Sequence, residues 1–342
     1  MEILWFCLVA GMIATYVVLD GFDLGAGIVH LLIARTDGER RQVIGAIGPV
    51  WDGNEVWLLA AGGTLYFAFP ALYASSFSGF YLPLMMVLWL LILRGLSIEL
   101  RSHVSAHLWT SFWDVALGVA SLLLAVFFGA ALGNVVRGVP MNADGYFFLP
   151  LWTNFQPGKD CGIVDWYTMS IGVAAALALT MHGALWVALK TDGKIQDRTK
   201  RVARGTWWGV AGFAGLITVL SFRVQPRFRE NFSSHPWGYI FPLLAVAGLL
   251  GVRSQGELMT FLCSSAYICG TLASVAFGIF PYVLPSNGDV NLGLTVYNTA
   301  AAHYGLGVGL GWFIPGIILA AGYFFFVYRH FAGKVRMEET TP

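Results

Sequence analysis

The sequence predicts an all-α membrane protein that crosses the bilayer nine times. Hydrophobic residues make up 57% of its 342 residues and charged residues only 11%, whereas soluble domains carry about 25% charged residues. The mean hydropathy is +0.68, and long apolar segments recur along the whole chain. Because these segments leave no room for a soluble domain, we expect one integral-membrane domain over residues 1–342.

Apolar runs of about 20 residues, the length that crosses about 30 Å of hydrocarbon, define the predicted helices. The first run is longer than this and is expected to tilt or protrude. A polar hinge over 35–41 separates it from the second run, which Pro70 ends. The nine runs are 4–34, 47–69, 77–96, 112–135, 163–189, 206–222, 237–252, 258–283 and 304–328.

Polar or Pro/Gly-rich segments separate the later helices. A polar patch over 99–110 precedes the fourth helix, and the longest loop, 137–162, precedes the fifth. A basic turn over 190–204 leads into the sixth helix. The seventh helix is short, and the loop 284–301 precedes the ninth, after which a charged tail ends the chain.

The distribution of Lys and Arg predicts the orientation. The links after the first, third, fifth and seventh helices and the tail carry 15 of the 20 Lys and Arg residues, counting Arg94 at the end of the third helix. The other five are Arg137, Lys159, Arg223, Arg227 and Arg229. Because cytoplasmic loops carry the positive excess, we expect the N-terminus outside and the C-terminus in the cytoplasm.

Charge and cysteine usage exclude some functions. The net charge of +1 offers no concentrated basic face, so a nucleic-acid partner is not expected. The four cysteines show no CxxC or CxxCH spacing, which favours packing over metal binding. They are Cys7, Cys161, Cys263 and Cys269.

Four acids in the first two helices are the main candidates for function: Asp20, Asp23, Asp52 and Glu55. A carboxylate near the bilayer centre costs roughly 2.5–3.5 kcal/mol on insertion scales. The short hinge makes the two helices antiparallel neighbours, and each pair is spaced i, i+3, so all four could line one seam. At about 1.5 Å per residue, Asp52 lies about 8 Å and Asp20 about 21 Å from the cytoplasmic end.

The four acids lie at increasing depth from the cytoplasmic end, which is the arrangement that a proton relay from the cytoplasm needs. Two close carboxylates cannot both ionise cheaply in a low dielectric, so one acid of each pair is expected to hold a proton. Two alternatives remain open. The acids could hydrogen-bond across tightly packed helices, which Gly21, Gly25 and Gly27 would permit. They could also bind a cation, which would need more oxygen ligands than the sequence shows.

Two further residues have several interpretations. His182, about two turns from the cytoplasmic end of the fifth helix, could ligate haem with a Met, contact a quinone head-group, or be a hydrogen-bonded core histidine. Asp114 sits at the start of the fourth helix, where an acid commonly pairs with the helix dipole. A structural role is therefore expected for Asp114.

Six motifs, in order along the chain, resemble subunit II of the cytochrome bd-type quinol oxidases. They are DGFDLG at 20–25, GPVWDGNEVW at 48–57, FSGFYLP at 77–83, HGA at 182–184 with LKT at 189–191, FPYVLPS at 280–286 and LTVYN at 294–298. The resemblance covers essentially the whole chain. It implies two four-helix bundles plus one peripheral helix in a bacterial or archaeal cytoplasmic membrane.

The resemblance also implies partners and cofactors. The partner would be a haem-bearing subunit I that holds two b-type haems, one d-type haem and the quinol site, often with a small single-helix subunit attached. No haem would be ligated by this chain, although some members hold a structural quinone. The complex would oxidise quinol outside and reduce oxygen to water with cytoplasmic protons, without pumping.

At the level of residues, the resemblance implies a proton path through Asp23 and Asp52 to the partner's oxygen-reducing haem. Asp20 and Glu55 would be coupled neighbours, and Glu55 an accessory because the family accepts Gln there. The sequence departs from many relatives after Asn298, where they carry a Ser–Ser pair.

Two other function classes remain open on the residues alone. A proton- or ion-coupled secondary transporter would use mid-membrane acids to couple ion flux, and a structural scaffold would only support the haem subunit. Transporters often contain inverted repeats and helices broken at mid-membrane. Neither feature is evident here.

Overall fold

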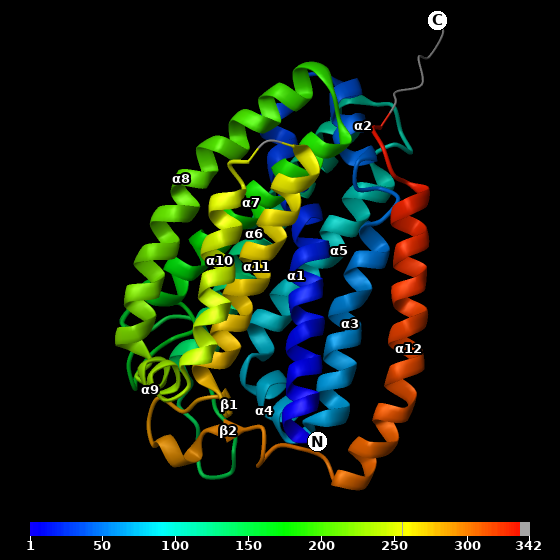
Figure 1. Cartoon of the computed structure of the whole chain (residues 1–342). Helices are drawn as coiled ribbons and strands as arrows, with labels where there is room; N and C mark the ends of the chain where they lie inside the picture. Colours follow the sequence, from blue (N-terminus) through cyan, green and yellow to red (C-terminus); the bar gives the residue numbers. More distant parts are fainter. Residues whose placement is uncertain (255, 336–342) are drawn as a thin grey trace, which may run out of the picture.

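Long helices run side by side along one axis in the computed structural model, which describes residues 1–254 and 256–335 (Figure 1). Each predicted apolar run coincides with a helix. The helices are α1 Glu2–Ile33, α3 Trp51–Ala68, α5 Tyr81–Leu100, α6 His107–Arg137, α7 Trp166–Lys190, α8 Gly193–Val224, η1 Pro236–Tyr239 with α10 Ile240–Gly251, α11 Glu257–Ile279 and α12 His303–His330.

Seven helices of the described residues are long and apolar enough to cross a membrane: α1, α5, α6, α7, α8, α11 and α12. The other two predicted spans do not meet this criterion. The first two turns of α3 carry the polar residues Asp52, Asn54 and Glu55, and α10 has only 12 residues.

Short elements occupy the links. They are α2 Asp37–Gly45, α4 Pro70–Gly79, α9 Arg227–Ser234, η2 Val290–Leu292 and the antiparallel strands β1 Tyr282–Leu284 and β2 Leu294–Thr295. The predicted polar hinge is therefore helical, and the Thr36 side chain caps α2 by accepting a hydrogen bond from the Glu39 N–H. The prediction of a basic turn over 190–204 is wrong for most of its length. Residues 193–204 form about the first third of α8, because Lys, Arg and Gln favour helix even beyond the apolar segment.

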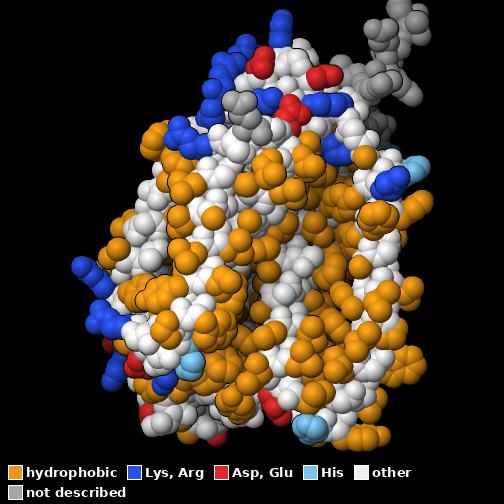
Figure 2. All heavy atoms as spheres, in the orientation of Figure 1, with side chains coloured by type: hydrophobic (Ala, Val, Ile, Leu, Met, Phe, Trp, Pro, Cys, Tyr) orange, Lys and Arg blue, Asp and Glu red, His pale blue; other side chains and the backbone are white. Residues whose placement is uncertain are grey.

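The central helix is α1, which packs against α3, α6, α7 and α11. In Figure 1, α8 and α12 lie at opposite edges of the molecule, and α12 contributes only Leu306 to the buried residues. The N-terminus lies at the end of the molecule that carries β1 and β2. The opposite end, here called the α2 end, carries α2, the ends of α7 and α12 and the start of α8 (Figure 1). Lys and Arg side chains gather at the α2 end, with a smaller group beside α9 (Figure 2).

Glycines allow α1 and α7 to touch backbone to backbone. A Cβ added at Gly25 would lie 1.9 Å from the Leu179 carbonyl oxygen, and one at Gly183 would lie 2.2 Å from the Gly25 carbonyl carbon. On the neighbouring face, a Cβ at Gly27 would lie 2.2 Å from the Ser121 Oγ of α6. The close packing that the glycines of α1 permit is therefore present.

Replacing Gly25 by Ala is expected to destabilise the protein, because the obstacle is backbone that cannot move aside as a side chain can. Overpacking of this kind costs about 1–3 kcal/mol or more. The measurement is the thermal unfolding midpoint of the purified protein. Gly11→Ala on the same helix is the matched control, since no atom lies within 4 Å of a Cβ there. Equal midpoints for the two variants would contradict the packing.

Candidate functional site

A buried arginine joins two of the four acids. Arg94 of α5 donates from Nη1 to Asp20 Oδ1 at 2.6 Å and from Nη2 to Glu55 Oε2 at 2.8 Å. Arg94 and Asp20 are fully buried, and the Glu55 side chain is 23% exposed. This triad ties α1, α3 and α5 together. Asp20 and Glu55 therefore take part in hydrogen bonds across packed helices, one of the three interpretations left open for the acids, with an arginine partner that was not predicted.

Asp23 has a different environment. Its Oδ2 accepts a hydrogen bond from Asn54 Nδ2 at 2.8 Å, and Asn54 Oδ1 accepts one from the Tyr328 hydroxyl at 2.8 Å. Asp23 Oδ1 is buried without a hydrogen-bond partner among the described residues, and none of their cations forms a salt bridge with Asp23. A buried carboxylate without a counter-ion is costly. Of the four acids, Asp23 is therefore the best suited to bind and release a proton.

Asp52 lies apart from this buried set. It is exposed in the first turn of α3 and makes no hydrogen bond to the described part of the chain. The predicted seam thus brings together Asp20, Asp23 and Glu55, with Arg94 and Asn54 between them. Asp52 faces the outside of the chain, where it can meet the medium or another subunit.

Arg94 is the main residue that sequence reasoning missed. Grouping Arg94 with the cations of the link after the third helix is wrong, because Arg94 lies inside α5, which continues to Leu100. The signal was present: an arginine within an apolar run needs an anionic partner. Without Arg94, the Lys and Arg excess in the same links still remains.

A second cluster, near the α2 end, centres on Asp114. This carboxylate is 1% exposed and contacts three side chains: His30 at 2.9 Å, Arg40 at 2.6 Å and Arg101 at 2.6 Å. Arg101 also donates to Asp37 at 2.8 Å. Partial burial acts to raise the pKa of Asp37, but hydrogen bonds from Arg101 and Arg41 outweigh it and lower that pKa. Asp114 is thus an ion-pair centre that fastens α2 to α1, α5 and α6, a larger structural role than the predicted dipole pairing.

His182 has both ring nitrogens engaged inside the chain. Nδ1 lies 2.7 Å from Ser264 Oγ and Nε2 lies 2.9 Å from the Val18 carbonyl oxygen, and Phe261 stacks on the ring. Neither nitrogen is left for a haem iron or a quinone carbonyl, so the geometry favours a core histidine. Among the described residues, no group of three or more His, Cys, Asp or Glu could hold a metal ion.

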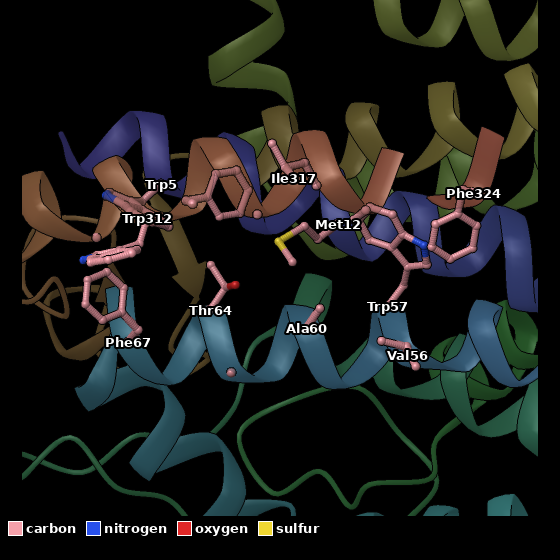
Figure 3. A pocket seen from close by; sticks show the side chains of 15 residues that line it. Trp5, Met12, Val56, Trp57, Ala60, Thr64, Phe67, Trp312, Ile317 and Phe324 are labelled. Carbon is pink, nitrogen blue, oxygen red and sulfur yellow. The ribbon is translucent and has the colours of Figure 1, made fainter. Parts of the chain in front are cut away.

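An apolar cavity of about 570 Å³ lies between α1, α3 and α12 (Figure 3). Figure 3 shows Trp57 and Phe324 at one end of it and Phe67 and Trp312 at the other. The polar atoms on its wall include the Thr64 hydroxyl and the Trp57 indole. Trp57 Nε1 is buried without a hydrogen-bond partner in the described part of the chain. The cavity therefore suits an elongated apolar molecule that carries a hydrogen-bond acceptor.

The fold and these clusters define a multi-pass helical membrane protein with an acid network buried beside its central helix. Comparison with known proteins identifies the family: the model of cytochrome bd terminal oxidase subunit II matches residues 1–331. This chain therefore belongs to that family and is a subunit of a bd-type terminal oxidase, an oxidoreductase complex of bacterial membranes. This assignment removes the transporter alternative.

Individual relatives agree with the assignment. A probable cytochrome oxidase subunit 2 from Haemophilus influenzae is 30% identical over 98% of this chain and 95% of its own length. The cytochrome bd-I ubiquinol oxidase subunit 2 of Escherichia coli K12 is 29% identical over 99% of this chain and 96% of its own. The fold is similar to a chain of the bd oxidase from Geobacillus thermodenitrificans, with a TM-score of 0.73 and 17% identity over 96% of this chain and 98% of that one.

Proposed function

We propose that this chain crosses the membrane nine times, with the N-terminus outside and the α2 end in the cytoplasm. The basic residues of the α2 end support this orientation. Beside the seven long apolar helices, α3 and η1–α10, which lie alongside them (Figure 1), would supply the other two spans. The two bundles implied by the resemblance would be α1, α3, α5 and α6 on one side and α7, α8, α10 and α11 on the other, joined where α7 packs against α1 and α6. The peripheral helix would be α12.

Within the oxidase, the chain would serve as the haem-free partner of a subunit that carries two b-type haems and one d-type haem. The complex would oxidise quinol on the outer side and reduce oxygen to water with cytoplasmic protons. In the described residues both nitrogens of His182 are already bonded, so no haem step is assigned to this chain. A small single-helix subunit is a further expected partner.

The chain's own contribution would be a proton path from the cytoplasm toward the partner. One observation carries this proposal: Asp23 is a fully enclosed carboxyl that no cation of the described chain neutralises. A charge at that position is unfavourable, so Asp23 can take up a proton from one side and release it to a stronger acceptor on the other. Asp52, on the exposed turn at the start of α3, would be a second carrier at the chain surface, with Asp20 and Glu55 as coupled neighbours.

The large apolar cavity would hold a structural quinone. Its aromatic lining suits an isoprenoid chain, and the unpartnered Trp57 N–H is a donor for a quinone carbonyl. The bound quinone would supply packing rather than chemistry there, because none of the acids described above lines the cavity.

Affinity purification through a tag on this chain is expected to bring down a haem-bearing subunit in a stable complex. The physical reason is the apolar surface of this chain, which two subunits can bury together within the membrane. The measurement is the visible spectrum of the purified material, in which a d-type haem band is expected. Purification of this chain alone, without haem, from cells that express both subunits would contradict the proposal.

A further inference from the structure

A second cavity, of about 290 Å³, lies at the α2 end of the molecule. Its walls come from the segment 45–50 before α3, the end of α7, the end of α12 and the residues that follow α12. They combine polar with apolar groups. The lining includes Ala46, Trp186, Lys190, Tyr328, His330 and Lys334. Unlike the apolar cavity, it contains the polar partners that a bound water needs.

Each of the two lysines in this wall has a partner within the described chain. Lys334 forms a salt bridge with Glu257 at 2.7 Å. Lys190 donates to the Phe331 carbonyl oxygen at 2.5 Å, and its ammonium lies 5.0 Å from the Trp186 ring centre. Glu257 therefore offsets part of the Lys334 charge, which reduces the repulsion that Lys334 exerts on an entering proton, while the carbonyl and the ring stabilise the Lys190 ammonium without neutralising it.

Tyr328 connects this cavity to the buried acid. It lines the cavity, and its hydroxyl donates to Asn54 Oδ1, whose amide in turn donates to Asp23 Oδ2, each at 2.8 Å. This is a continuous run of hydrogen bonds from the α2 end to Asp23. Asp52 has no such connection among the described residues.

We propose that this cavity is the entrance through which protons reach Asp23, and that the Tyr328 hydroxyl passes them on. The inference rests on the proposed function, in which Asp23 carries protons for the oxidase. It adds Tyr328 and the cavity to a path that was predicted from Asp23 and Asp52, with Asp20 and Glu55 as neighbours.

The transfer step involves protons only. A hydronium ion that enters the cavity from the α2 end gives a proton to the Tyr328 oxygen while the Tyr328 hydroxyl gives its own toward the Asp23 carboxylate. A neutral water is left in the cavity, the tyrosine ends as it began and Asp23 becomes neutral. The Asn54 amide is not a carrier, because amide N–H groups do not ionise near neutral pH. Asn54 instead positions both partners, and the acceptor is Asp23 Oδ1, which has no partner among the described residues and which the Tyr328 hydroxyl would reach through one bridging water.

Replacing Tyr328 by Phe in the whole complex tests the inference. Proton uptake during oxygen reduction, measured with a pH indicator, is expected to slow about tenfold or more, since a positioned proton donor contributes at least that much. The haem spectrum should be unchanged. Tyr323→Phe on the same helix is the matched control, because Tyr323 is 56% exposed and lies outside the cavity.

A second variant, at another residue of the cavity wall, keeps the test valid if Tyr328→Phe fails to fold. Ala332→Trp places a bulky ring in the cavity wall from an exposed position, and it is expected to slow proton uptake as well. Uptake at the wild-type rate in both variants, with slow uptake in Asp52→Asn, would overturn the cavity entrance and leave the proposed function standing. Wild-type uptake in Asp23→Asn would instead overturn the proposed function.

Discussion

Replacing Asp23 by Asn is expected to lower quinol-driven oxygen consumption by about 100-fold or more, the usual contribution of a positioned proton carrier. Asparagine keeps the size of the side chain and an oxygen that can accept from Asn54. It cannot take up a proton. The protein should therefore fold and assemble normally, and the haem spectrum of the purified complex should match that of the wild type.

The combination of lost turnover and retained haem distinguishes a proton carrier from a packing residue. Asp144→Asn is the matched control, because it makes the same chemical change at an exposed loop acid. Asp52→Asn should also lower turnover if the surface acid carries protons. Normal oxygen consumption in Asp23→Asn and Asp52→Asn would leave these acids with a structural role only.

Replacing Arg94 by Met is expected to destabilise the protein by about 3–5 kcal/mol, the usual cost of removing one partner from a buried ion pair. The substitution would leave Asp20 fully buried and Glu55 largely buried without their shared cation. The measurement is the thermal midpoint and the yield of assembled complex. The thermal midpoint of Arg94→Lys should lie between those of the wild type and Arg94→Met, because an ammonium cannot donate to both carboxylates in the geometry of a guanidinium.

Neutralising the acids at the same time should restore stability. In the triple variant Arg94→Met, Asp20→Asn, Glu55→Gln, no unpaired charge remains, so most of the lost stability is expected to return. Arg229→Met, at an exposed position in α9, is the control for loss of one arginine. If Arg94→Met were as stable as this control, the triad would not hold the three helices together.

The sequence predicted the helices well because hydropathy alone decides which segments can be buried in lipid. It predicted less of the site, because partners depend on how helices rotate and pack. Arg94 is 74 residues from Asp20 and 39 from Glu55, and no local pattern links them. His30 was missed because it lies within a long apolar run, and its partner Asp114 is 84 residues away.

The spacing of the acids along the chain did not predict which of them meet in the folded protein. Asp52 and Glu55 are i, i+3 neighbours, yet Glu55 reaches Arg94 while Asp52 remains at the surface, because its position in the first turn of α3 lies outside the contact with α1 and α5. Tyr328 could not be connected to Asp23 from sequence, since Asn54 joins them only after α12 has packed against α3.

The uptake of protons from the medium during oxygen reduction tests the central claim most directly. Pre-reduced complexes, wild-type and Asp23→Asn, would be mixed with oxygen in weakly buffered medium, and a pH indicator would follow the loss of protons. We predict that uptake in Asp23→Asn slows by the same factor as oxygen consumption while haem content stays constant. Uptake at the wild-type rate in a fully assembled Asp23→Asn complex would contradict a proton path through this chain.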